Sequence, residues 1–476
     1  MSKQSLGTAF GVSFMRWMLC ALVGLTALGG LAGPAHGRVR PYPDETQTPP
    51  PQAGSAAVIR NTHAVIRQVV WREIRAGSFP GAVVLVGQGN RIVYFEAFGD
   101  RCVQPQRRLM QKNTLFDLAS LTKPLATAPA VLLLAERGQL SLDDHVRVYL
   151  PTFACGGKQD VRIRHLLTHT SGLPAYTSAA PLEKRFGPGC RDAVLGKICG
   201  LRAMNGPGET FRYSCLGYIT LARIVEIVTG RPFDAFIEHE LYRPLGMYQT
   251  QFTPLEDSVA EGQSRPSAFL PSAFHLPPVT PHLMRGPEHA ALAWAAALSG
   301  QGHQSPDAFA TIQGRIAATQ VVDGQPLRGI VHDPLARLAG GVSGNAGLFS
   351  TARDLSLFCR MLLNGGELNG RRVLSAESVR LLTTEQSHGR AYGFDVSSGY
   401  AWLKGAYGPA EAFCHSGYTG TSLVCDPCGG VYIIILTNSV HPDDAGKTRA
   451  VRVGVADIVF RACGYARRGD SMDGGG

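Results

Sequence analysis

Phe116-Asp-Leu-Ala-Ser120-Leu-Thr-Lys123 opens a strong helical pattern that runs from Thr122 to Arg137. Residues three apart on a helix share one face, so the Lys123 ammonium can lie beside the Ser120 hydroxyl. A serine hydroxyl is a poor nucleophile alone, and a neighbouring amine whose pKa is lowered by burial can accept or relay its proton. The helix start also leaves backbone N–H groups free to stabilise an oxyanion. Alone, the Ser-x-x-Lys spacing is a weak motif, because a polar helix start with a solvated lysine has the same pattern.

Two further segments carry reactive side chains. Phe211-Arg-Tyr213-Ser-Cys215 precedes a helical pattern at 218–229 and places a phenol where a loop meets that helix. Phe413-Cys-His415-Ser416-Gly417 places an imidazole and a hydroxyl on a strand near the C-terminus. We therefore expect a hydroxyl, an amine, a phenol and an imidazole, far apart along the chain, to meet around one site.

These motifs, in this order and on these elements, resemble those of the serine β-lactamase and penicillin-binding-protein-like hydrolases. The resemblance is nearest to the class C and esterase branch, whose pattern is S-x-x-K, then Y-x-N, then [HK]-[ST]-G. Segments 163–174, 340–351 and 436–442 are also similar to family segments. The likeness covers roughly residues 56–463, apart from 255–310.

The resemblance implies an acyl transfer in two steps through an acyl-serine, without metal or cofactor. Ser120 is then the nucleophile, Lys123 its activator, and Tyr213 the general base or acid that handles the leaving-group proton. A free phenol titrates near pH 10, so Tyr213 is effective only if Lys123 and its surroundings favour the phenolate.

The third motif is expected to line the same site. His415 is expected among the catalytic groups, and Ser416, Gly417 and Cys215 among those that contact substrate. The backbone N–H groups of Ser120 and of Tyr418, which follows Gly417, are expected to form the oxyanion hole.

Two departures from the family pattern affect the choice of substrate. Cys215 stands where the family usually has asparagine, and a thiol cannot replace the paired hydrogen bonds of an amide. His415 stands where many members have lysine, and its charge is expected to depend on pH near 6.5. Both favour a small-molecule ester, a peptide or a peptidoglycan-derived substrate over a β-lactam. The alternatives are a non-catalytic relative that binds peptidoglycan or a peptide, and a true β-lactamase.

The fold class follows from where strand and helix patterns fall. A helical pattern at 56–76 is followed by a hairpin at 82–98, strand patterns return at 400–403, 411–415, 421–424 and 431–436, and a last helix spans 446–463. The residues between are mainly helical. We predict an α+β fold, in which one antiparallel sheet is built from both chain ends and flanked by the terminal helices, with an all-α subdomain inserted.

The N-terminus has the features of an export signal. Residues 1–37 combine positive charge, an apolar run at 17–31 and small residues at Ala35 and Gly37, so we expect cleavage after Gly37 and no membrane span in the mature chain. An uncleaved anchor is the alternative. Residues 38–55 read as a Pro-rich linker, 56–465 as the hydrolase domain, 255–310 as an insertion and 466–476 as a disordered tail. The protein is expected in the periplasm or cell envelope.

Composition excludes other classes. Lys plus Arg exceed Asp plus Glu by 46 − 36 = 10, but the basic residues form no block, so nucleic-acid binding is not indicated. Ten cysteines lie outside the signal, and Cys190 with Cys199 is a plausible disulfide loop. Cys425-x-x-Cys428 lies between two strand patterns without a second cysteine pair, and His165-x₃-His169 has no Glu between its histidines, so no metal site is expected.

Overall fold

A six-stranded antiparallel sheet forms the centre of the computed structural model, which describes residues 62–252, 312 and 314–468. Its strands, in spatial order, are β11 (Phe413–Ser416), β12 (Ser422–Asp426), β13 (Val431–Thr437), β1 (Gly81–Gln88), β2 (Arg91–Cys102) and β3 (Arg108–Leu109). The two ends of the chain meet where β13 pairs with β1, with Ala82 opposite Thr437 and Gln88 opposite Val431. The predicted sheet built from both chain ends is confirmed.

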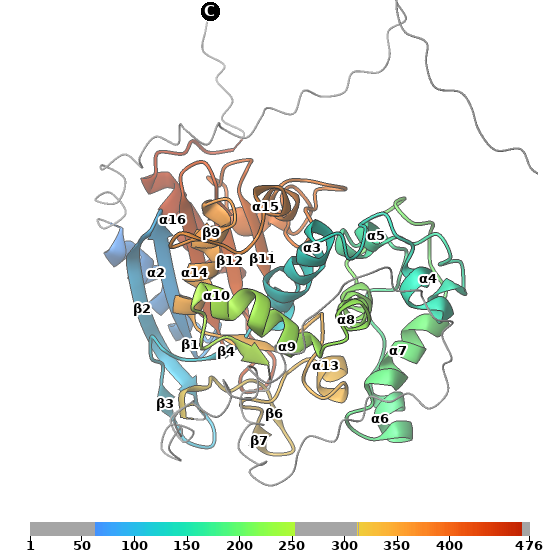
Figure 1. Ribbon diagram of the computed structural model, residues 1–476. Coiled ribbons are helices and arrows are strands. Elements are labelled where there is room, and N and C mark those ends of the chain that lie inside the picture. The colour runs from blue at the N-terminus through green and yellow to red at the C-terminus, as the bar shows by residue number, and fades with distance from the viewer. Residues whose placement is uncertain (1–61, 253–311, 313, 469–476) are drawn as a thin grey trace, which may run out of the picture. The chain divides into compact units, whose positions relative to one another are not determined.

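Both faces of this sheet are covered by helices (Figure 1). α2 (His63–Arg75) and α16 (Arg449–Ala462) share one apolar core with Val84 and Val86 of β1. The alternate residues Val83 and Leu85 point into a second core that includes α14 (Ala352–Leu363). Because successive side chains of a strand point to opposite faces, a strand covered on both sides is apolar throughout, and every residue of β1 is buried.

The middle of the chain is helical, as predicted. The helices of this part of the chain, together with two that come later in the sequence, are α3 (Ala128–Glu136), α4 (Val146–Tyr149), α5 (Ile163–Leu167), α6 (Ala180–Phe186), α7 (Arg191–Gly200), α8 (Cys215–Thr229), α9 (Phe233–Ile237), α10 (Arg243–Leu245), α13 (Pro334–Leu338) and α15 (Ala376–Thr383).

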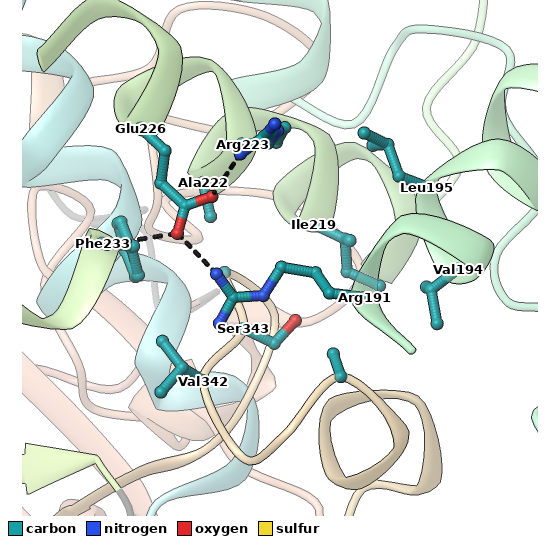
Figure 2. Close-up of a pocket in the computed structure, with 12 residues that line it drawn as sticks. Arg191, Val194, Leu195, Ile219, Ala222, Arg223, Glu226, Phe233, Val342 and Ser343 are labelled. Atoms are coloured by element: carbon teal, nitrogen blue, oxygen red, sulfur yellow. Dashed lines mark hydrogen bonds and ion pairs between the residues drawn. The ribbon is translucent and has the colours of Figure 1, made fainter. Parts of the chain in front are cut away.

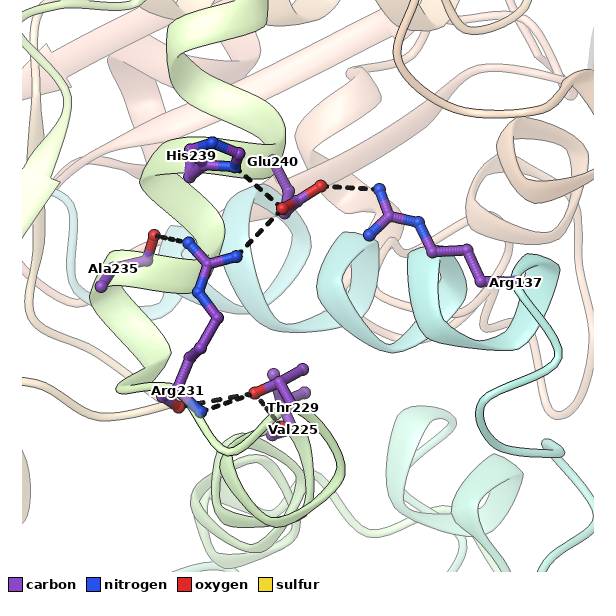
Figure 3. A network of polar contacts seen from close by, with 7 residues as sticks. All are labelled: Arg137, Val225, Thr229, Arg231, Ala235, His239 and Glu240. Atoms are coloured by element: carbon purple, nitrogen blue, oxygen red, sulfur yellow. Dashed lines mark hydrogen bonds and ion pairs between the residues drawn. The ribbon is translucent and has the colours of Figure 1, made fainter. Parts of the chain in front are cut away.

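Glu240, just after α9, accepts hydrogen bonds from Arg137 at the end of α3 (2.7 Å) and from Arg231 after α8 (3.1 Å), as Figure 3 shows. This carboxylate therefore links the end of α3, which follows the turns that carry Ser120 and Lys123, to the end of α8, which begins at Cys215.

A small second sheet holds the segment before Ser120. β4 (Phe116–Asp117) and β5 (Gln251–Phe252) pair with β8 (Leu348–Ser350) between them. The remaining short strands form two hairpins, β6 (Val321–Val322) with β7 (Gln325–Pro326), and β9 (Glu367–Leu368) with β10 (Arg371–Arg372). The chain around Ser120 is thus fixed by strand pairing on its N-terminal side.

The predicted helix at 122–137 is interrupted in its first turns. A 3₁₀ turn, η1 (Ala119–Leu121), is followed by a π turn, η2 (Lys123–Thr127), before α3 begins. Pro129 has no N–H to donate to the carbonyl of Leu125, and that carbonyl accepts from the Tyr242 hydroxyl instead, at 3.2 Å.

Two predictions from the sequence are wrong. Residues 400–403 are not a strand: Ala401–Lys404 form a 3₁₀ turn, and the buried Lys404 ammonium donates to three backbone carbonyls at 2.8–3.0 Å. A short apolar run cannot by itself distinguish strand from turn. Cys190 and Cys199 flank α7 about nine residues apart, roughly 13 Å along a helix, which is too far for a disulfide. Both thiols are free.

The predicted signal (1–37), linker (38–55) and insertion (255–310) lie outside the described residues. The predicted tail (466–476) lies there from residue 469 onward, while Arg468 still donates its backbone N–H to the carbonyl of Ala406 at 2.8 Å. Among the described residues, no helix is both long and apolar enough to cross a bilayer.

Candidate active site

Ser120 stands on the short 3₁₀ turn η1, which follows β4. Ala119 before it has φ +46°, a left-handed conformation that costs energy for a residue with a Cβ. Asp117 holds this turn by accepting from the Ala119 N–H (2.9 Å), and the Thr122 hydroxyl donates to the Ala119 carbonyl (2.7 Å). The strained turn leaves Ser120 half-buried, so its hydroxyl remains reachable from solvent.

Lys123 is completely buried one turn further on. Its Nζ lies 3.1 Å from Ser120 Oγ, 3.5 Å from Cys215 Sγ and 3.0 Å from the backbone oxygen of Asn345. Burial works against the ammonium, but Cys215 and Tyr213 outweigh it, and the pKa of Lys123 is raised. The expectation that burial lowers this pKa is therefore wrong, because acceptors surround the amine.

Tyr213 completes the cluster from the loop before α8. Ser120 and Lys123 lie close enough to its hydroxyl for both to oppose the rise in its pKa, and Lys123 Nζ lies 5.0 Å from the centre of its ring. Burial raises the pKa of Tyr213, and the opposing effects of Lys123 and Ser120 do not cancel it. The resting site therefore contains a neutral phenol beside an ammonium.

His169 supports the ring of Tyr213, a function that the sequence did not reveal. The two rings stack with centroids 4.4 Å apart and 30° between planes. His169 Nδ1 accepts from the N–H of Ser214, at 3.0 Å, so the histidine binds the residue next to the tyrosine. Burial places the pKa of His169 well below its usual value, and the imidazole is neutral.

The third motif lies on β11, close to the nucleophile. A Cβ on Gly417 would lie 2.3 Å from the carbonyl oxygen of Leu118 and 2.2 Å from Thr421 Oγ1, so only glycine fits between these groups. Thr421 Oγ1 donates to that Leu118 oxygen at 2.9 Å, and Thr419 Oγ1 donates to the Asp117 oxygen at 2.6 Å. Two hydroxyls thus fasten the end of β11 to the strand that leads to Ser120.

The two N–H groups predicted for the oxyanion hole are both available. Neither the N–H of Ser120 nor that of Tyr418 donates to another described residue. The half-buried Ser416 lies one residue before Gly417, and the exposed Tyr418 side chain donates from its hydroxyl to Asp444 at 3.0 Å, away from the cluster. The free backbone N–H groups of Ser120 and Tyr418 are thus consistent with the predicted oxyanion hole.

His415 lies near the cluster but does not titrate as expected. Its ring centroid is 6.1 Å from that of Tyr213, and its Nδ1 lies 2.9 Å from the backbone oxygen of Ser416. Burial first, then the nearby Arg390 and Lys123, lower the pKa of His415 well below its usual value. The expectation of a charge change near pH 6.5 is wrong, because this imidazole is fully buried and two buried cations lie near it.

Arg390 is a site residue that the sequence did not single out. It is fully buried and paired with the almost fully buried Asp395. Its guanidinium carbon lies 6.0 Å from the centre of the Tyr213 ring and 5.9 Å from that of Phe211. No motif surrounds Arg390 in the sequence, and only the folded chain brings its positive charge beside the phenol.

Asn345 supplies an amide beside the unusual Cys215. Its backbone oxygen accepts from Lys123, and its side chain is close enough to Cys215 to influence the pKa of the thiol. Its buried Nδ2 makes no hydrogen bond of normal geometry within the described part of the chain. Burial nevertheless raises the pKa of Cys215, which makes the thiol a poor nucleophile.

A cavity behind this segment is too small for a substrate. It measures about 20 Å³, and Figure 2 shows Ser343 and Val342 on one side of it and the Arg191–Glu226 ion pair on the other. This volume is enough for about one water molecule. Within 62–252 and 314–468, no three His, Cys, Asp or Glu side chains are grouped to hold a metal ion.

Comparisons with known proteins agree with this geometry. A family model described as Beta-lactamase matches residues 64–457. A protein of Bacillus subtilis (strain 168) named N-acetylmuramyl-L-alanine amidase is 30% identical over 395 residues, which cover 79% of this chain and 80% of that protein. A protein of Escherichia coli (strain K12) named "Putative D-alanyl-D-alanine carboxypeptidase" is 30% identical over 422 residues, which cover 84% of this chain and 87% of that protein.

The fold is also found among solved structures. EstCE1, described as a hydrolase with promiscuous acyltransferase activity, has a TM-score of 0.59 at 19% identity, with 85% of this chain and 99% of that chain covered. The fold and the Ser120, Lys123 and Tyr213 cluster define a serine hydrolase. This chain belongs to the Beta-lactamase family.

Proposed function

We propose that the protein hydrolyses an ester or amide bond of a cell-envelope substrate, as an esterase or a D,D-carboxypeptidase, through an acyl-Ser120 intermediate. The observation that carries this proposal is the 3.1 Å contact between Lys123 Nζ and Ser120 Oγ, with the centre of the Tyr213 ring 5.0 Å from the same Nζ. The names of two relatives, one an amidase of muramyl peptides and one a D-alanyl-D-alanine carboxypeptidase, favour a peptidoglycan-derived peptide.

The proposed chemistry is a proton relay through the phenol. Ser120 Oγ forms a bond to the substrate carbonyl carbon while its proton moves to the Tyr213 oxygen. Tyr213, which accepts this proton as the phenolate, then passes it to the leaving oxygen or nitrogen as the carbonyl–leaving-group bond breaks. The Lys123 ammonium stabilises negative charge on the phenol oxygen during the transfer, and the N–H groups of Ser120 and Tyr418 stabilise the oxyanion. Water then reverses these steps and releases the acid.

We also propose that the protein acts outside the cytoplasm. The support is the signal-like segment 1–37 and the location of peptidoglycan itself. Expression of the full chain followed by cell fractionation, with N-terminal sequencing of the exported form, tests this directly. A mature N-terminus at Arg38 is expected, and an uncleaved cytoplasmic protein would contradict export.

An acylation assay tests the proposed reaction. The purified protein is incubated with a p-nitrophenyl ester, a D-alanyl-D-alanine peptide and a fluorescent penicillin, beside Ser120→Ala and the exposed control Ser178→Ala. Turnover of the ester or peptide that Ser120→Ala abolishes and Ser178→Ala retains supports the proposal. Penicillin turnover faster than either would indicate a β-lactamase. No acyl adduct on Ser120 with any probe would favour a non-catalytic binding protein.

A further inference from the structure

A surface hollow lies away from the active site, at the edge of the main sheet. It is bordered by Cys102 of β2, Arg108 of β3, Gln325 of β7, and by Gln106 and Arg328 from the adjoining loops. Its volume is about 310 Å³, roughly ten times the volume that a water molecule takes in the liquid. None of its lining residues belongs to the Ser120 cluster.

Two half-buried arginines, Arg108 and Arg328, line this hollow, the half-buried Arg101 lies near both, and none of the three has an acidic partner among the described residues. Arg108 and Arg328 make no side-chain hydrogen bond or ion pair with any residue that the structure describes, although both line the hollow. Arg101 donates only to the backbone oxygen of Leu109, and its buried Nε has no partner there. The nearby carboxylate of Asp100 accepts from Arg107 at 2.7 Å. Half-buried guanidinium groups normally find acceptors, so this arrangement is unusual.

The charges of these arginines oppose one another. Burial lowers the pKa of Arg101, and the positive charges of Arg108 and Arg328 lower it further. Burial and then Arg108 likewise lower the pKa of Arg328. The one group that acts in the opposite direction on either arginine is the thiol of Cys102. A bound anion would relieve both the repulsion and the unsatisfied donors.

We propose that this hollow binds a phosphate group, held by Arg108 and Arg328, which line it, with the guanidinium of Arg101 beside them. A guanidinium presents a planar fork of donors that matches two oxygens of an oxyanion. Three such groups offer more donors than the two oxygens of a carboxylate can accept, whereas a phosphate monoester has three terminal oxygens. The amides of Gln106 and Gln325 border the remaining space, which is large enough for the sugar or glycerol to which the phosphate is attached.

Calorimetric titration with sodium pyrophosphate at constant ionic strength tests this site. Wild type should bind pyrophosphate and not acetate, and Arg108→Gln/Arg328→Gln should weaken binding at least about tenfold. Arg371→Gln, which removes an exposed positive charge elsewhere, should leave the affinity within about twofold of wild type. Equal binding by wild type and the double variant, or no binding of pyrophosphate by wild type, would overturn the proposal.

Thermal unfolding gives a second readout. Without added phosphate the double variant should unfold at a higher temperature than wild type, because the repulsion is removed, and pyrophosphate should stabilise wild type alone. A double variant that pyrophosphate stabilises as much as wild type would contradict the site. A double variant that unfolds at a lower temperature than wild type without phosphate would show that these arginines are structural, and would also overturn the proposal.

A vesicle assay distinguishes a lipid headgroup from a soluble phosphate as the ligand of this hollow. Phosphatidylglycerol vesicles and phosphatidylcholine vesicles are sedimented with wild type and with the double variant. Arginine-dependent binding to phosphatidylglycerol alone identifies a lipid headgroup, while binding of pyrophosphate without vesicles identifies a soluble phosphate. If only vesicles bind and both proteins bind them equally, the hollow is not the phosphate site.

Discussion

Tyr213 lies beside Ser120 and Lys123, and in the proposed reaction its protonation state governs how Ser120 is activated. Burial raises its pKa, and the active phenolate is therefore gained as pH rises toward that pKa and lost as pH falls. We expect kcat/KM for a p-nitrophenyl ester to increase from about pH 6 to about pH 10, and Tyr213→Phe to lower it by about 10²- to 10⁴-fold and flatten the profile. The exposed Tyr248 provides the control variant Tyr248→Phe.

Two results would contradict this assignment of the pH profile to Tyr213. Lys123, Cys215 and Arg390 also face the phenol, and each carries or can carry charge. A wild-type rate that is already maximal below pH 7, with Tyr213→Phe equally active, would show that the phenol transfers no proton. Retention of the rising profile in Tyr213→Phe would assign it to Lys123 instead.

The amide of Asn345 is positioned to replace the asparagine that the second motif lacks. Its buried Nδ2 is without a hydrogen-bond partner among the described residues, beside Cys215 and near the Lys123 ammonium. We expect Asn345→Leu, which keeps the shape but removes the amide, to lower kcat/KM by about 10- to 100-fold. Cys215→Asn introduced into that variant should restore activity, because it returns an amide to the same place. Unchanged kinetics in Asn345→Leu would exclude this function.

At the scale of elements, the distance between β11 and the Ser120 turn depends on Gly417. A methyl group there would meet the Leu118 oxygen at 2.3 Å, and a backbone carbonyl cannot turn away as a flexible side chain can. We expect Gly417→Ala to shift the Tyr418 N–H and to lower kcat by about 10²-fold. The overpacking should also destabilise the fold by about 1–3 kcal/mol.

Gly196→Ala is the matched control for this substitution. Gly196 lies on α7, where an added Cβ meets no atom within 4 Å, so its replacement should leave kcat unchanged. Crystal structures or hydrogen exchange of both variants would show whether β11 has moved. Full activity of Gly417→Ala would mean that the oxyanion hole does not depend on this close approach.

At the scale of the whole molecule, the buried ion pair of Arg390 and Asp395 connects the site to the main sheet. Asp395 exchanges backbone hydrogen bonds with Cys414 of β11, while Arg390 faces Tyr213 from the helical side. We expect Asp395→Asn to reduce the free energy of unfolding by about 3–5 kcal/mol, because it leaves an uncompensated buried cation. Urea unfolding measures this loss.

The control is Glu377→Gln, which breaks an exposed ion pair with Arg380 on α15 and should cost less than about 1 kcal/mol. Similar losses of unfolding free energy in both variants would show that the buried ion pair stabilises the fold no more than the exposed pair does. Activity measured in Asp395→Asn at permissive urea concentrations then separates a loss of folding from a change at Tyr213.

The motifs predicted most of the reactive groups because their chemistry is local. Ser120 and Lys123 lie three residues apart, and a helical or 3₁₀ backbone places such side chains together whatever else surrounds them. Apolar runs bounded by turn residues likewise predicted β1 and β13, and a helical pattern predicted α14, since each is an apolar element of sufficient length. The sheet built from both chain ends followed from where those patterns fall.

The electrostatics of the site depended on the tertiary structure. Asn345, Arg390 and His169 come from segments far from Tyr213 along the chain. His169 and Asn345 lie in segments that resemble the family, but that likeness did not indicate their contacts, and nothing in the local sequence marks Arg390. A pKa depends on burial and on charges within a few ångströms, which sequence neighbours do not define. For this reason the sequence determined which groups react and in which fold, while packing alone decided that Lys123 keeps its proton, that His415 loses its expected charge, and that an amide lies beside Cys215.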